Sequence, residues 1–312
     1  MQLINPKIDY AFKKIFGSEE SKDILISFLN ALVYDNEAKI KDLEILDPYI
    51  APIIKGVKDT YVDVRARLSD DTTVIIEMQI LNYEGFEKRI LYNAAKMYSV
   101  QLKEGEPYSL LNPVIALTIT DFIMFDNIEN IKSCFILKEK KELIDYTIND
   151  LELMFVELPK FDKSLDNLET LFDKWIFFLK NAIKIHTVPE VFEIVPELKK
   201  AISIANRINF TQEELDALQK SEFWIYDQKN FLPSIERRGF EKGLKHGLQK
   251  GAEEGIRKGM EQGIQQGMEQ GIQRQNEIII RNALFKGLTI EDIIDLTRLS
   301  KEEIQNIINN IE

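Results

Sequence analysis

The spacing of apolar positions predicts paired helices and a strand pair in the first part of the chain. Residues 9–32 carry apolar side chains at helical spacing with a break near 17–21, which predicts two helices. Segments 61–68 and 73–81 alternate apolar and polar residues around a short polar turn. This alternation predicts two strands joined as a hairpin.

Further elements follow the predicted hairpin. A helix is expected over about 86–103, and the continuous apolar run 113–120 predicts a strand buried on both faces. Strands are also expected at 134–137 and 153–158, and the pattern turns helical over 165–228. This order of elements predicts an α/β core followed by a helical annex.

The polar positions of the hairpin share one face. Each strand carries an even-numbered apolar set, at positions 62–68 on the first and 74–80 on the second, so burying both sets on one face requires an odd number of loop residues, three or five. Residues two apart on a strand point to the same side, so Glu77 and Gln79 share a face. The same register brings Asp63 onto that face, opposite or diagonal to Glu77.

Two carboxylates beside a polar side chain are a candidate Mg²⁺ site. Mg²⁺ binds one or two carboxylates and keeps several waters, which leaves room for a phosphate oxygen. Such an ion polarises the phosphoryl group and activates a bound water. The alternative from spacing alone is a solvated hairpin face whose charges pair across the strands, as Arg65 and Arg67 permit.

A glycine repeat changes the character of the chain near residue 236. Nine glycines recur at every fourth position from Gly239 to Gly271, usually followed by an apolar residue. In a helix each glycine costs about 0.8–1.0 kcal/mol relative to alanine, so an isolated helix of this composition should not persist. The repeat is therefore either an oligomerisation helix with a partner packed along the glycines or a flexible linker of variable repeat number. A DNA-contacting arm is a weaker third alternative, because residues 236–274 contain eight basic and six acidic side chains and so carry little net positive charge.

The last residues predict a small helical tail. Thr289 with Asp292 and Ser300 with Glu303 have the spacing of capping boxes, and they resemble a helix-turn-helix outline. Residues 276–312 hold seven acidic and four basic side chains. This balance favours a protein-interaction module over a DNA-reading one.

Composition limits the remaining chemistry. The 312 residues include 52 acidic and 40 basic side chains, a net charge of −12, so nucleic-acid binding would need a local basic patch. One cysteine, Cys134, excludes a disulfide framework and suits a reducing compartment. Two distant histidines, His186 and His246, leave little room for a zinc site or a histidine-centred triad.

No apolar run reaches the roughly 20 residues of a membrane span, and the first residues lack a signal-peptide core. A cytoplasmic protein without a membrane partner is expected.

The hairpin motif is similar to a PD-(D/E)XK nuclease core in which Gln79 stands at the usual lysine position. Other segments resemble one branch of that superfamily, the Rpn family of recombination-promoting nucleases and transposases. These segments are 9–17 (DYAFKKIFG), 63–65 (DVR), 76–79 (IEMQ), a helix with Arg89, Tyr92 and Tyr98, 113–115 (PVI) and 121–122 (DF). The resemblance covers about residues 1–235, and the glycine repeat with a short helical tail is also typical of the family.

The resemblance implies a restriction-endonuclease-like α/β fold in four parts: a nuclease core over 1–160, a helical annex over 161–235, a glycine-repeat helix or linker over 236–275 and a small helical tail over 276–312. It implies a metal-dependent DNA endonuclease, linked to DNA recombination or transposase-like activity. The glycine repeat adds the expectation of a homo-oligomer assembled through residues 236–312. The alternative is a catalytically weak or inactive nuclease-fold protein that binds a partner or DNA in regulation or defence.

The resemblance also assigns roles at the hairpin. Asp63 and Glu77 would bind Mg²⁺, and Gln79 would orient or bind the attacking water. Asp9 would complete the acidic set, although a residue at the head of a helix also serves as a cap or a dipole partner.

Glutamine at position 79 lacks the positive charge of lysine, so either a neighbouring cation replaces it or activity is weak. Arg89, Tyr92 and Lys96 share a face of the next predicted helix and are the candidates. Each also has a structural alternative: Arg89 as partner of a hairpin carboxylate, Tyr92 in the core and Lys96 as solvated surface.

DNA binding requires a basic groove near Asp63. We expect this groove to draw on Arg65, Arg67, Lys88, Arg89 and Lys96.

Overall fold

The computed structural model describes residues 1–50 and 59–311, and the chain forms two compact units, Met1–Phe231 and Leu232–Glu312. We describe each unit separately.

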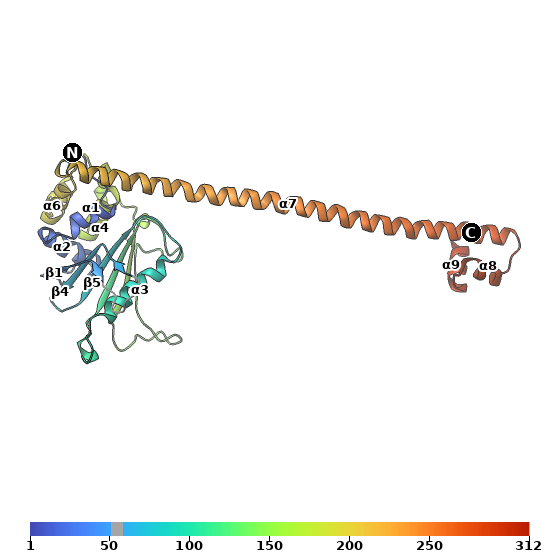
Figure 1. Ribbon diagram of the computed structural model, residues 1–312, viewed down its shortest axis with the longest axis horizontal. Helices are drawn as coiled ribbons and strands as arrows, with labels where there is room; N and C mark the ends of the chain where they lie inside the picture. Colours follow the sequence, from blue (N-terminus) through green and yellow to red (C-terminus); the bar gives the residue numbers. More distant parts are fainter. Residues whose placement is uncertain (51–58, 312) are drawn as a thin grey trace. The chain divides into compact units, whose positions relative to one another are not determined.

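The first unit is built on a six-stranded sheet in the order β1-β4-β5-β6-β8-β7 (Figure 1). The strands are β1 Leu43–Leu46, β4 Val64–Leu68, β5 Thr73–Gln79, β6 Val114–Thr120, β7 Lys132–Phe135 and β8 Leu151–Glu157. The pairs β1–β4, β4–β5 and β7–β8 are antiparallel, whereas β5, β6 and β8 run parallel. A separate two-stranded ribbon joins β2 Tyr49–Ile50 to β3 Thr60–Tyr61.

Helices cover both faces of this sheet. The main core lies on one face, beneath α1 Asp9–Phe16, α2 Lys22–Leu32, α4 Leu171–Asn181 and α6 Pro196–Ile204. The other face packs against α3 Phe86–Ser99 (Figure 1). Other described helical segments of this unit are the start of α7 Gln212–Phe285, α5 Glu190–Glu193 and the single 3₁₀ turns Glu19–Ser21, Tyr108–Leu110, Leu158–Lys160, Leu165–Asn167, Ala182–Lys184 and Arg207–Asn209. The architecture confirms the predicted α/β fold with helices around a central sheet.

The hairpin register follows the predicted rule. Val64 pairs with Ile76 and Ala66 with Val74, so even-numbered residues face even-numbered ones. The connection between the last paired positions covers residues 68–72, an odd number, and its Asp71 adopts a left-handed backbone conformation. The even-numbered apolar residues of β4 and β5 therefore enter the main core, whereas the odd-numbered Ile75 and the preceding Val62 belong to a second core cluster.

A cluster of four aromatic rings fills the core between α1, α2 and α4. The Phe28 ring lies 4.5 Å from Phe16 and 5.5 Å from Trp175, and Phe12 lies 4.7 Å from Phe16. The Trp175 indole N–H donates to the Ser27 hydroxyl at 3.3 Å. This cluster fixes α1, the helix that brings Asp9 to the hairpin.

The second unit contains most of α7 Gln212–Phe285, together with α8 Ile290–Thr297 and α9 Lys301–Ile311. The glycine repeat lies inside α7, where its apolar side chains are exposed. Within the described part of the chain, a Cβ placed on any of the nine glycines would meet no atom within 4 Å. The described residues therefore supply no packing along the glycines.

The tail has its own small core of Ile280, Ala283, Ile293 and Ile304. Both predicted capping patterns are present. The Thr289 hydroxyl accepts the Asp292 amide, and Asp292 in turn accepts the Thr289 amide. None of the described helices is both long and apolar enough to cross a membrane.

Candidate active site

The predicted carboxylates meet where β5 ends. The β4–β5 register, continued by one pair beyond Val64 and Ile76, sets Asp63 opposite Glu77. The Asp63 amide donates to the Ile76 carbonyl at 3.1 Å, and the Met78 amide donates to Asp63 Oδ2 at 2.7 Å. The two side chains are largely buried, with exposed fractions of 14% and 13%. The structure thus brings both carboxylates to the same end of the hairpin.

Helix α1 places the Asp9 carboxyl group and the Lys13 ammonium group near Asp63. Lys13 Nζ lies 2.6 Å from Asp9 Oδ1 and 3.6 Å from Asp63 Oδ1. Burial raises the pKa of Asp63 well above that of an ordinary aspartate, and a hydrogen bond with Asp9 raises it further. Burial also acts to raise the pKa of Asp9, but hydrogen bonds from Asp63 and Lys13 outweigh it and lower that pKa. The pKa values of these two neighbouring carboxyl groups are therefore shifted in opposite directions, upward for Asp63 and downward for Asp9.

Helix α3 supplies the partners of Glu77. The Arg89 guanidinium donates to Glu77 Oε1, and Asn93 Nδ2 donates to Glu77 Oε2 at 3.4 Å. Burial raises the pKa of Glu77, while Arg89, Asn93 and Lys13 act in the opposite direction. Glu77 is therefore a buried carboxylate with a cation beside it.

Gln79 holds this arrangement in place. Arg89 Nη2 donates to Gln79 Oε1 at 2.9 Å, and Gln79 Nε2 donates to the Leu81 carbonyl at 2.9 Å. Both ends of the amide are thus engaged with the protein. In this geometry Gln79 positions the Arg89 guanidinium beside Glu77.

Lys13 is a candidate site residue that the sequence pattern did not single out. It contacts Asp63 directly and acts electrostatically on Glu77, so it lies near both carboxylates. Its spacing of four residues from Asp9 on one helix was a usable signal, because such residues share a helix face.

The other predicted cations are distributed differently. Lys96 is buried, and its Nζ donates to the Ile50 carbonyl at 2.9 Å and the Thr60 hydroxyl at 3.2 Å, so it supports the β2–β3 ribbon instead of facing a substrate. Its burial also contradicts the solvated-surface alternative.

Arg65 and Arg67 lie farther along β4, away from the carboxylates. Arg65 Nη1 donates to the Asp47 carbonyl at 3.3 Å, and Arg67 lies 3.8 Å from Glu44. Both line a separate cavity of about 320 Å³. Lys88 is exposed on α3. Of the five predicted groove cations, the structure brings Arg89 alone into contact with a site carboxylate among the described residues.

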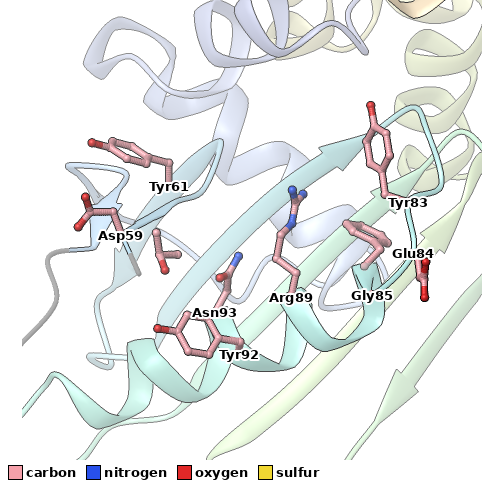
Figure 2. Close-up of a pocket in the computed structure, with 10 residues that line it drawn as sticks. Asp59, Tyr61, Tyr83, Glu84, Gly85, Arg89, Tyr92 and Asn93 are labelled. Atoms are coloured by element: carbon pink, nitrogen blue, oxygen red, sulfur yellow. The ribbon is translucent and has the colours of Figure 1, made fainter. Parts of the chain in front are cut away.

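A larger cavity opens beside Glu77. Its volume is about 630 Å³, and Arg89 and Asn93, the two partners of Glu77, form part of its wall (Figure 2). Tyr92 also lines this cavity and is exposed, which contradicts its alternative role in the core.

The donor set suits a cation held by two carboxylates. Over residues 1–50 and 59–311, no three His, Cys, Asp or Glu side chains are arranged to hold a metal ion, so Asp9 does not form a three-carboxylate set with Asp63 and Glu77. Two carboxylates still meet the demand of Mg²⁺, which retains several waters. Lys13 and Arg89 now contact these carboxylates, and a metal ion would have to displace one or both of them.

Comparison with known proteins gives one match. A family model described as PD-(D/E)XK nuclease family transposase matches residues 6–234. This span includes α1, the hairpin and α3, and it ends before the glycine repeat. No curated protein and no solved structure matches the chain.

Proposed function

The chain belongs to the PD-(D/E)XK nuclease family transposases, and from this we propose that it is a Mg²⁺-dependent DNA endonuclease acting through Asp63 and Glu77. One observation carries the proposal. Two largely buried carboxylates occupy opposed backbone positions at the end of the hairpin, and each has a cation from a different helix beside it. A role in DNA recombination or transposase-like activity is part of the same proposal.

Asp63 and Glu77 would hold the divalent cation through their carboxylate oxygens. When bound, this ion supplies Lewis-acid activation of the phosphate and of a water molecule. Asp9 lies outside the pair and accepts the hydrogen bonds of Asp63 and Lys13, so its role is to position these two groups.

Lys13 and Arg89 supply the positive charge that Gln79 lacks. Cations fixed beside the reacting phosphate stabilise the negative charge that develops there in the transition state. Lys13 is held by Asp9, and Arg89 is held by Gln79. Gln79 thus acts through Arg89, a positioning role that differs from binding the attacking water.

The same contacts support a second candidate function. Because Arg89 pairs with Glu77 and Lys13 lies against Asp63, both carboxylates are neutralised by protein cations. A nuclease-fold protein in this state would bind DNA or a partner without efficient cleavage.

Plasmid nicking with Mg²⁺ separates the two functions. We expect Asp63→Ala and Glu77→Ala to lower the nicking rate by at least about 100-fold, the scale of losing one preorganised group. Asp42→Ala, which removes an exposed carboxylate away from the site, is the matched control and should keep full activity. Chelation of Mg²⁺ should abolish nicking in the wild-type protein.

Equal nicking by all variants would assign the activity to another site. DNA binding without any nicking by the wild-type protein would favour the second candidate function. Thermal unfolding of each variant shows whether a lost activity reflects a lost fold.

We also propose that the chain forms a homo-oligomer through residues 236–312. The exposed apolar side chains of α7, among them Leu244, Ile256 and Ile264, and the open surface along the glycines support it. Sedimentation should show an oligomer for the wild-type chain and a smaller species when these three residues are replaced by glutamine. A monomeric wild-type chain would contradict it.

A further inference from the structure

The cavity beside Glu77 has a wall shared with the proposed active site. Arg89 and Asn93 line it, and both also bind the Glu77 carboxylate. Its volume of about 630 Å³ lies within the range of roughly 300–1,000 Å³ that small-molecule sites occupy. A molecule bound in this cavity would therefore meet two side chains, Arg89 and Asn93, that also bind the Glu77 carboxylate.

Three tyrosines surround the cavity. Tyr61 comes from β3, Tyr83 precedes α3 and Tyr92 lies on α3, and all three are exposed. Figure 2 shows their rings on different sides of the cavity, with the Arg89 guanidinium between Tyr61 and Tyr83. Tyr61, of which 66% is exposed, packs against Tyr49 with the two rings tilted by 34° at a centroid distance of 4.9 Å. Exposed aromatic faces of this kind bind nucleobases by stacking, and the stacking tolerates any base.

The charges around the cavity disfavour a phosphate. Among the described residues that line it, Arg89 is the only cation, and its guanidinium already contacts Glu77 and Gln79. Two carboxylates, Asp59 and Glu84, also lie on the wall. Carboxylates repel phosphate but accept hydrogen bonds from the amino groups of bases. The lining thus suits a flat, uncharged ring that carries N–H donors.

We infer that this cavity takes the base of an unpaired nucleotide next to the scissile phosphate. The inference rests on the proposed function, because the phosphate of that nucleotide would lie at Asp63 and Glu77. In a regular duplex each base is stacked and paired, so a base enters such a cavity only when it is unpaired or extruded. The preferred substrate is therefore DNA that is single-stranded or distorted at the cleavage position.

A binding experiment without metal tests this inference independently of cleavage. The full-length protein is titrated in a chelating buffer against two fluorescein-labelled DNA duplexes, one with a single unpaired adenine and one fully paired. Fluorescence anisotropy gives both dissociation constants at the same salt concentration. We expect the duplex with the unpaired adenine to bind about tenfold more tightly.

Variants of the tyrosines identify the cavity. Tyr61→Leu and Tyr92→Leu should each reduce the preference by about fivefold to tenfold, which corresponds to losing roughly 1 kcal/mol or slightly more of stacking. Tyr92→Phe keeps the ring and should keep the preference. Tyr108→Leu removes a largely exposed tyrosine outside the cavity and is the matched control. The exposure of all these rings makes loss of the fold unexpected, and thermal unfolding checks it.

Equal affinity of the wild-type protein for the two duplexes, or no binding to either, would overturn the inference. A Tyr61→Leu or Tyr92→Leu variant that weakens both duplexes equally would also overturn it. If Asp63→Ala abolishes nicking and the preference is absent, this inference alone fails. If the preference is present and nicking survives Asp63→Ala and Glu77→Ala, the catalytic assignment alone fails.

Discussion

Phe28 in α2 and Phe240 in α7 are the same residue type in opposite surroundings. Phe28 has no exposed surface and stacks against Phe16 and Trp175, whereas 72% of Phe240 is exposed. The contrast extends to the segments around them. Helices α1, α2 and α4 bury one side against the sheet, while the apolar residues of the glycine repeat contact no core of the described chain. Burial within the chain stabilises the first unit. The glycine repeat lacks such burial, so its helix needs another source of stability, such as a partner packed along the glycines.

The largest effect should come from removing Phe28. Phe28→Ala deletes a fully buried ring from the aromatic cluster, so it should lower the free energy of unfolding by about 3–5 kcal/mol. Phe240→Ala removes an exposed ring and should change it by less than about 0.5 kcal/mol in the monomeric protein. Urea denaturation followed by circular dichroism measures both. Similar losses in the free energy of unfolding for the two variants would contradict this difference between the buried and the exposed phenylalanine.

Alanine in the glycine repeat should act in the opposite direction. Gly247, Gly251 and Gly255 each have open space where a Cβ would lie, so replacing all three with alanine should stabilise the helix by roughly 2–3 kcal/mol. Thermal melting of the helical signal, at a concentration where the protein is monomeric, should shift upward. A weaker association of the same variant at high concentration would identify the glycines as a packing surface between copies.

Two capping boxes that begin with threonine, one with a buried aspartate and one with an exposed aspartate, allow a matched comparison. Thr170 caps α4 with Asp173, which is buried, and Thr289 caps α8 with Asp292, which is exposed. Thr170→Ala should lower the free energy of unfolding of the first unit by about 1–2 kcal/mol, and Thr289→Ala should cost the tail about 0.5–1 kcal/mol. Hydrogen exchange of the amides in each first helical turn can measure the two effects separately. An equal cost at both sites would show that burial of the cap does not matter.

The smallest effect concerns Glu214 at the start of α7. Hydrogen bonds from Lys14 and Tyr10 lower the pKa of Glu214 to about 2, from an ordinary value of 4.5. A lowered pKa in the folded state stabilises the protein above pH 4.5, and this contribution is lost as the pH falls towards 2. Glu214→Gln should therefore destabilise the protein at neutral pH by at most about 1 kcal/mol, because the pair lies near the surface.

The difference between Glu214→Gln and wild type should vanish near pH 2. Glu213→Gln, one residue earlier in the same helix, is the matched control and should behave as wild type. A difference that stays constant from neutral to acid pH would rule out this ionic contribution.

Much of the first unit follows from local patterns. The alternation of the hairpin fixed which residues face the core, and the register placed Asp63 opposite Glu77 as expected. The family and the α/β fold class are confirmed. The four-part division of the chain and the catalytic roles of the site residues stay predictions.

Tertiary contacts explain what the sequence could not provide. Strand β1 is only four residues long, too short for a recognisable alternation, and pairing with β4 defines it. The helical spacing of Arg89, Tyr92 and Lys96 suggested one shared surface. The β2–β3 ribbon covers Lys96 and leaves the other two exposed, and no local pattern reports such a distant contact.

The first residues of the chain are tied to a segment about 200 residues away. The Ile4 amide donates to the Ala205 carbonyl at 2.9 Å, and the Arg207 amide donates to the Gln2 carbonyl at 2.9 Å. A ribosome adding roughly 5–20 residues per second needs on the order of 10–40 s to cover that separation. During this time α1, with Asp9 and Lys13, is already made but lacks its final neighbours. The last step in forming the proposed nuclease site during synthesis is therefore the arrival of α6 and the residues after it.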